Sequence, residues 1–162
     1  MTYEIQLKRP EFDEEDLLRG QNIVTSNIRV LVGDTCVTSS SGDFSVADYL
    51  PQNPLKFLKA GQAIANGDSY TVSFNYCLCD IQYTPDGGET AVLATDTNGN
   101  PLNPSVSPPG IRTDTQAVVE EHERYARHVY DRFEVIGQIG EQDRTFQELR
   151  KLLEEPPFDG NE

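Results

Sequence analysis

Residues 66–83 read NGDSYTVSFNYCLCDIQY, and this stretch decides the fold class. Asn66–Asp68 is a tight-turn signal, and apolar and polar residues alternate after it from Ser69 to Tyr83. Alternation with a period of two places successive side chains on opposite faces of a strand. The buried face changes near Cys77–Asp80, which predicts a bulge or a passage from one sheet to another. The stretch therefore predicts one strand from Ser69 to Tyr83 within an antiparallel β region.

The residues before this stretch add further strands. Apolar residues alternate over 28–32, and the turn pair Gly33–Asp34 leads into a second β-type run over 35–38, which predicts a hairpin. A brief strand is expected at 44–46. Residues 51–58 show no clear period between their prolines, so we expect a short strand or turn there.

The residues after this stretch return the chain to the sheet and then leave it. Pro85–Gly88 is a strong turn, followed by a return strand over 90–95. Asn98–Gly99 is a hairpin signal. The prolines that follow exclude a regular central strand, so residues 100–110 are expected to be extended.

Helices are expected mainly at the C-terminal end. From residue 113 the apolar spacing becomes helical, with Thr113 and Gln116 as a capping box and Gly137 or Gly140 as the stop. A second helix is expected over about 142–154. At the other end of the chain, Tyr3, Ile5 and Leu7 predict a short strand.

Together these signals predict an α+β fold with an antiparallel β-sandwich or small barrel core and a C-terminal helical arm. The expected segments are an N-terminal arm (1–20), an antiparallel β domain (21–99), a Pro-rich linker (100–112), a two-helix C-terminal arm (113–155) and a flexible acidic tail (156–162).

The charge of the chain restricts its partners. The net charge is −14, and residues 113–162 hold half of the excess. Acidic surfaces repel phosphate backbones and anionic lipids, so direct binding to nucleic acid or a membrane surface is not expected. No stretch reaches the roughly 18–20 apolar residues of a membrane span, and the N-terminus lacks signal-peptide features. Basic protein surfaces are the expected partners.

The apolar stripe of the C-terminal arm is the candidate protein interface. It must be covered either by the β domain of the same chain or, through the Pro-rich linker, by a neighbouring subunit. The candidate interface residues are Val118, His122, Tyr125, Val129, Phe133, Ile136, Phe146, Leu149, Leu152, Leu153 and Phe158.

Metal and redox chemistry have only weak signals. Cys77 and Cys79 would lie about 6–7 Å apart on one side of a strand, and no second ligand pair accompanies them, so core thiols are expected rather than a zinc site. Cys36 leaves a redox pairing open. Asp96–Asn100 imitates the start of a calcium loop, but Pro101 stands where the loop needs glycine, which favours a plain turn. We expect no metal and no cofactor.

Catalytic patterns are also missing from the sequence. His122 and His128 are six positions apart, which turns them about 240° apart on a helix, so they cannot share one ion. His122 on the apolar stripe fits a packing role. No Gly-x-Ser-x-Gly elbow and no phosphate-binding Gly-x-x-x-x-Gly-Lys loop occurs. We therefore expect the protein not to be an enzyme.

Residues 43–46, 55–57 and 67–76 contain short strands, a Gly-Asp turn and the strand pattern Thr-Val-x-Phe-x-Tyr. In this they resemble the β-hairpin pattern of structural proteins of tailed bacteriophages, over about a quarter of the chain. Pro51–Pro54 departs from the tidy turn of that pattern. The resemblance implies a virion protein, made in the host cytoplasm, of the neck, head-tail connector or tail. It would form a homo-oligomer and join other virion proteins through its arms, residues 1–20 and 113–162.

An acidic binding module is the alternative. Carboxylates of residues 113–136 and of the acidic tail would lie where phosphates lie in the natural complex, and would inhibit a basic or nucleic-acid-binding protein.

Overall fold

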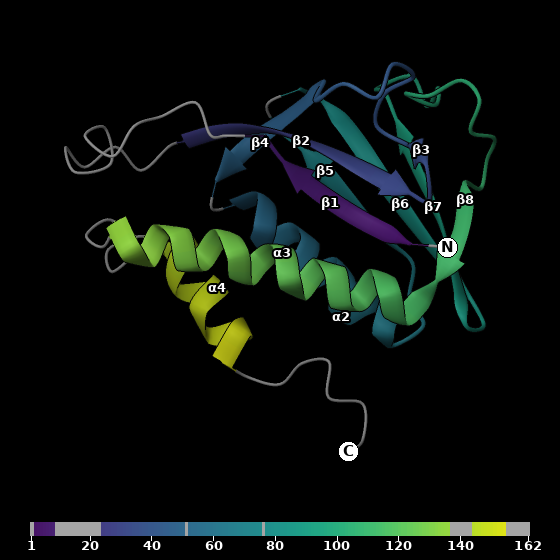
Figure 1. Cartoon of the computed structure of the whole chain (residues 1–162). Coiled ribbons are helices and arrows are strands. Elements are labelled where there is room, and N and C mark those ends of the chain that lie inside the picture. Colours follow the sequence, from purple (N-terminus) through teal and green to yellow (C-terminus); the bar gives the residue numbers. More distant parts are fainter. Residues whose placement is uncertain (1, 9–23, 51, 76, 137–143, 155–162) are drawn as a thin grey trace.

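Over the residues that it describes, the computed structural model shows an α+β protein with two antiparallel four-stranded sheets and three helices (Figure 1). Neither sheet is closed within the residues that it describes. The described residues are 2–8, 24–50, 52–75, 77–136 and 144–154. Residues 9–20 of the expected N-terminal arm, the expected helix stop at Gly137 or Gly140, the expected acidic tail and Phe158 lie outside this part of the chain. The side chains of Phe133, Ile136 and Phe146 also lie outside it.

The two sheets are called first and second by the order of their strands along the chain. The second sheet is a meander of consecutive strands in the order β5-β6-β7-β8. Its strands are β5 (Tyr70–Phe74), β6 (Cys79–Asp86), β7 (Glu89–Thr95) and β8 (Ile111–Asp114). The expected return strand over 90–95 is confirmed as β7, which pairs with β6 across the turn at Gly87–Gly88. Two tight hairpins, β5–β6 and β6–β7, and a longer connection to β8 therefore build this sheet.

The prediction of one long strand over 69–83 is wrong. The chain reverses between β5 and β6, so that Tyr70 pairs with Tyr83 and Phe74 with Cys79. Leu78 has a φ of 50°, in the left-handed region that L-residues seldom adopt, and this conformation belongs to the turn. The change of buried face that the sequence shows near Cys77 marks a chain reversal rather than a bulge.

The first sheet is built around β2, which pairs with β3 across a tight hairpin and with β1 and β4 at longer separations along the chain. Its strands are β1 (Tyr3–Leu7), β2 (Val24–Val32), β3 (Thr35–Cys36) and β4 (Val46–Leu50). The N-terminal strand is confirmed and pairs Ile5 with Val30. The hairpin across Gly33–Asp34 is also confirmed, because Val32 pairs with Thr35.

Helix α2 (Gln52–Ala65) replaces the short strand or turn expected at residues 51–58. Pro54 lies in the first helical turn, where proline is tolerated because the amide groups of that turn have no partner inside the helix. Phe57, Ala60 and Ile64 follow at helical spacing, and each is at most 1% exposed. The helical spacing of these residues was not recognised in the sequence, because Pro51 and Pro54 suggested a strand or a turn.

Helices α3 (Thr115–Ile136) and α4 (Arg144–Glu154) confirm the two predicted C-terminal helices. The expected capping box is wrong, because Asp114 caps α3 by accepting the Ala117 N–H at 3.1 Å. Helix α3 runs across the sheets beside α2 and contacts β1, while α4 packs against α2 and α3 (Figure 1).

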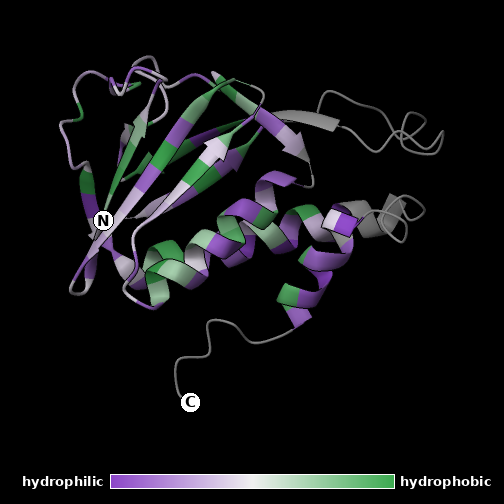
Figure 2. Cartoon of the chain, turned by 180° about the vertical axis from the view of Figure 1, so that it is seen from behind, coloured by the Kyte–Doolittle hydropathy of each residue, from purple (hydrophilic) through white to green (hydrophobic). Residues whose placement is uncertain are grey.

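One hydrophobic core joins both sheets to α2 and α3, and the strands alternate hydrophobic and hydrophilic residues over it (Figure 2). A second cluster holds α4 on α2 and α3. Its buried members are Leu55, Leu58, Ala126, Leu149 and Leu153.

Residues 100–110, expected to be an extended linker, lie against the β region. The Leu102 N–H donates to the Ala94 carbonyl at 2.9 Å, and Val106 is 3% exposed in the core. Gly110 has a φ of 120°, and a Cβ there would overlap the Val92 carbonyl. This contact brings the chain back beside β7 to form β8.

Candidate functional site

The structure places most of the predicted interface residues inside the chain's own fold. Val118, His122, Tyr125 and Val129 are each at most 1% exposed and pack in the core that includes both sheets. Leu149 and Leu153 are buried in the second cluster, and Leu152 packs against it partly buried. Of the two alternatives for the helical stripe, cover by the same chain is therefore the arrangement that these side chains adopt.

Glu121 and Arg124 of α3 hold the free edge of β1. The Ile5 N–H donates to Glu121 Oε2 at 2.7 Å, and Arg124 Nη2 donates to the Ile5 carbonyl at 3.0 Å. Arg124 also donates to Glu121 Oε2 at 2.7 Å, which raises the pKa of the guanidinium. The pair thus makes the two hydrogen bonds that a neighbouring strand would make, and it covers this edge.

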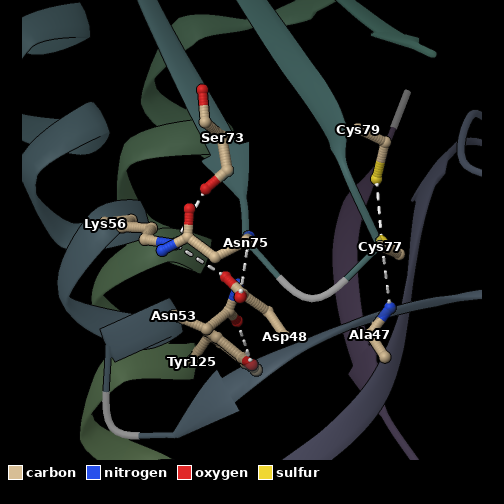
Figure 3. Close-up of polar contacts among 9 residues, drawn as sticks. All are labelled: Ala47, Asp48, Asn53, Lys56, Ser73, Asn75, Cys77, Cys79 and Tyr125. Atoms are coloured by element: carbon tan, nitrogen blue, oxygen red, sulfur yellow. Dashed lines mark hydrogen bonds and ion pairs between the residues drawn. The ribbon is translucent and has the colours of Figure 1, made fainter. Parts of the chain in front are cut away.

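Asp48 of β4 forms a second polar centre, shown in Figure 3. Its side chain is 1% exposed and receives hydrogen bonds from Lys56 Nζ at 2.9 Å and from the Asn75 N–H at 3.1 Å. Lys56 also donates to the Ser73 carbonyl at 2.8 Å. Asp48 therefore ties the first sheet to α2 and to the end of β5.

A buried aromatic junction connects the two sheets with α3. The Tyr3 hydroxyl lies 2.7 Å from the Tyr83 hydroxyl and 2.8 Å from His122 Nε2. Burial lowers the pKa of His122 from its ordinary 6.5 to about 3, so the imidazole is neutral at pH 7. The packing role expected of His122 is confirmed.

Cys77 and Cys79 are much closer than the strand spacing predicts. Their Sγ atoms lie 3.0 Å apart, because the left-handed Leu78 between them turns the chain (Figure 3). The Ala47 N–H of β4 donates to Cys77 Sγ at 3.4 Å. Cys36 takes part in a different contact, with Thr38 Oγ1 at 3.4 Å. All three cysteines are free thiols.

The two thiols differ in acidity. The hydrogen bond from Cys79 lowers the pKa of Cys77 to about 7 against the opposing effect of burial, and the Ala47 N–H helps. The pKa of Cys79 is raised by the same hydrogen bond and by burial. The half-buried Cys77 is therefore the nucleophilic member of the pair.

A hollow of about 280 Å³ opens beside the cysteines. It is lined mainly by small hydroxyl and thiol side chains and by two apolar residues. The lining residues are Thr38, Ser39, Ser40, Ser45, Val46, Cys77, Cys79 and Leu102. The sequence showed the Cys-x-Cys pair but not these serines, because the loop that carries them is brought close only by the pairing of β2 with β3 and β4.

The calcium-like segment is a turn. Asp96 Oδ1 accepts the N–H groups of Asn98 at 2.9 Å and Asn100 at 3.0 Å, so the carboxylate that would bind a cation holds the backbone instead. Among the described residues, no three His, Cys, Asp or Glu side chains converge as a metal site. No described helix is long and apolar enough to span a membrane.

Comparison with known proteins adds no relative, since no family model, characterised protein or solved structure matches this chain.

Proposed function

We propose that this protein is a non-enzymatic structural subunit that oligomerises and joins neighbouring subunits in a bacteriophage particle, at the neck, the head-tail connector or the tail. The resemblance of residues 43–46, 55–57 and 67–76 to virion proteins names the class. We also propose that the core is a small sandwich or barrel. The hydrophobic cluster that the two sheets share supports this description.

The observation that carries the proposal is the use of charged groups at the edge of β1 and just after the end of β5. Glu121 and Arg124 bind the backbone of Ile5, and Asp48 binds the backbone of Asn75. Charged side chains placed in this way stiffen a framework and block uncontrolled strand addition, which a subunit present in many copies needs.

The surface for assembly is proposed on the outward side of α3. The buried stripe that includes Val118 and Tyr125 is already covered by the chain itself. Glu120, His128 and Arg132 are exposed on α3, and Glu120 and Arg132 bring charges of both signs to the surface of the helix. A mixed-charge surface can meet a second copy of itself.

Ion pairs along α3 weaken the case for an acidic inhibitor of a basic or nucleic-acid-binding protein. Glu121 pairs with Arg124 and Glu123 with Arg127 along α3. The helix therefore does not present an unbroken acidic face, which phosphate mimicry requires.

The native mass of the full chain, measured by light scattering over a range of concentrations, tests the proposal. We expect a defined multiple of 18.1 kDa. Glu120→Arg should lower that multiple, while Asp68→Arg in the exposed turn before β5 should not. A monomer at every concentration that also fails to enter particles would reject assembly. A monomer that binds a basic protein one to one would favour the inhibitor.

A further inference from the structure

We propose that Cys77 and Cys79 form a reversible disulfide by exchange with a low-molecular-mass disulfide such as oxidised glutathione. This inference does not depend on assembly into a particle. It rests on the geometry of the turn between β5 and β6, on the hollow beside it, and on the contact of Cys77 with β4.

The turn brings the two sulfur atoms within reach of each other. Their separation is 3.0 Å, whereas a disulfide bond is about 2.05 Å long. Closure thus needs an approach of about 1 Å, within a turn whose strands are already paired at Phe74 and Cys79. A regular strand would hold the side chains of residues 77 and 79 about 6–7 Å apart, so the left-handed Leu78 makes the pairing feasible.

Access to the pair is one-sided. Cys77 is half-buried and Cys79 is buried, and both line the hollow with Ser39, Ser40 and Ser45. Leu78 is 66% exposed, so the turn itself reaches solvent. The hydroxyl-lined hollow can admit the polar arm of a small disulfide, which would meet Cys77 first.

The reaction follows the usual course of thiol–disulfide exchange. The Cys77 thiolate attacks one sulfur of oxidised glutathione, the glutathione S–S bond breaks, and one glutathione thiolate leaves. Cys79 then loses its proton to solvent, attacks Cys77 Sγ of the mixed disulfide and releases the second glutathione. Two protein thiols are oxidised to one disulfide, and one glutathione disulfide is reduced to two thiols that take up the two protons.

Oxidation would also weaken a contact between the two sheets. In the reduced state Cys77 Sγ accepts the Ala47 N–H of β4, and a sulfur in a disulfide carries less negative charge for that bond. The contact of β4 with the β5–β6 turn then relies more on Asp48 and the Asn75 N–H. The Ala47 amide proton should therefore exchange faster with solvent after oxidation.

The test treats the full chain with mixtures of oxidised and reduced glutathione and follows intact mass and peptide mapping. The wild type should lose two hydrogen atoms, with the bond mapped to Cys77 and Cys79 and with Cys36 unchanged. The rate of disulfide formation should rise with pH and reach half of its maximum near pH 7. Dithiothreitol should restore the reduced mass.

Single variants separate the two roles. Cys79→Ser should stop at a mixed disulfide that carries one glutathione. Cys77→Ser should form its mixed disulfide about tenfold more slowly than Cys79→Ser. Cys36→Ser should form the disulfide as the wild type does. As a measurement that needs no variant, iodoacetamide should alkylate Cys77 first in the wild type. The proposal is overturned if no bond between residues 77 and 79 forms, if Cys36 is the partner, or if Cys77 and Cys79 react alike.

Discussion

The two sheets of this protein are put together differently. The second sheet, β5–β8, is a meander of consecutive strands, and all but the first residue of β7 are buried. The first sheet, β1–β4, also pairs β2 with the more distant β1 and β4, and charged side chains secure β1 and β4. The comparison teaches that local hairpins need apolar burial to stay in place, whereas strands brought together over long separations also need polar anchors.

The largest effect is expected in the apolar second sheet. Ile81→Ala should lower the free energy of unfolding by about 3–4 kcal/mol, because Ile81 is 1% exposed and its loss leaves a cavity. Ile81→Val should cost only about 1 kcal/mol. Urea denaturation measures both. A loss for alanine no larger than that for valine would contradict the role given to apolar burial.

The polar anchor of the first sheet should come next. Asp48→Asn should cost about 2–3 kcal/mol, because the Asp48 side chain is 1% exposed and its hydrogen bonds lose their charge, while the Lys56 ammonium, 23% exposed, is left beside a neutral amide. In the second sheet, Asp86→Asn removes an exposed ion pair with Arg112 and should cost less than about 0.5 kcal/mol. Equal effects of the two variants in denaturation would remove the distinction between the sheets.

The junction between the sheets should respond to acid. His122 has a folded-state pKa of about 3 against an ordinary 6.5, so the unfolded chain binds more protons between these values. Stability is therefore complete above pH 6.5 and falls as the pH drops toward 3, by about 2 kcal/mol at pH 5. His122→Gln removes this contribution, so its stability should depend less on pH in urea titrations from pH 8 to 4. Parallel curves for both proteins would reject a neutral buried His122.

The smallest effect is expected at the edge of β1. Glu121→Gln keeps an oxygen that can accept the Ile5 N–H but loses the charge facing Arg124, which is half exposed. We expect a cost of about 1 kcal/mol that shrinks in high salt, with faster hydrogen exchange at the Ile5 amide. Glu89→Gln at the exposed start of β7 is the control. An Ile5 amide as well protected in the Glu121 variant as in that control would show that the pair does not secure this edge.

Sequence reasoning succeeded where the signal is local. Alternation, turn residues and helical spacing identified β7, the β2–β3 hairpin, α3 and α4. It missed α2, because Pro51 and Pro54 suggest a break although Pro54 occupies the tolerant first turn. It also extended one strand across the β5–β6 reversal, since nothing local shows that Leu78 adopts a positive φ.

The candidate site was harder to read from the sequence. Cys77 and Cys79 were visible as a pair, but their 3.0 Å contact follows from the turn and from the seat of Cys77 against Ala47 of β4. Asp48 carried no sequence signal, because the brief strand expected at 44–46 ends before it. Its partners come from α2 and from the end of β5.

By itself the sequence determined the composition of this protein, its acidity, its helical and strand periods, and the presence of an apolar stripe that something must cover. Only the tertiary structure decided that the same chain covers it, with Tyr3, Tyr83 and His122 meeting between the sheets. The physical reason is that the spacing of apolar residues along a helix or strand shows only which side chains must be buried away from water. The partner that excludes the water is set by packing among segments far apart along the chain.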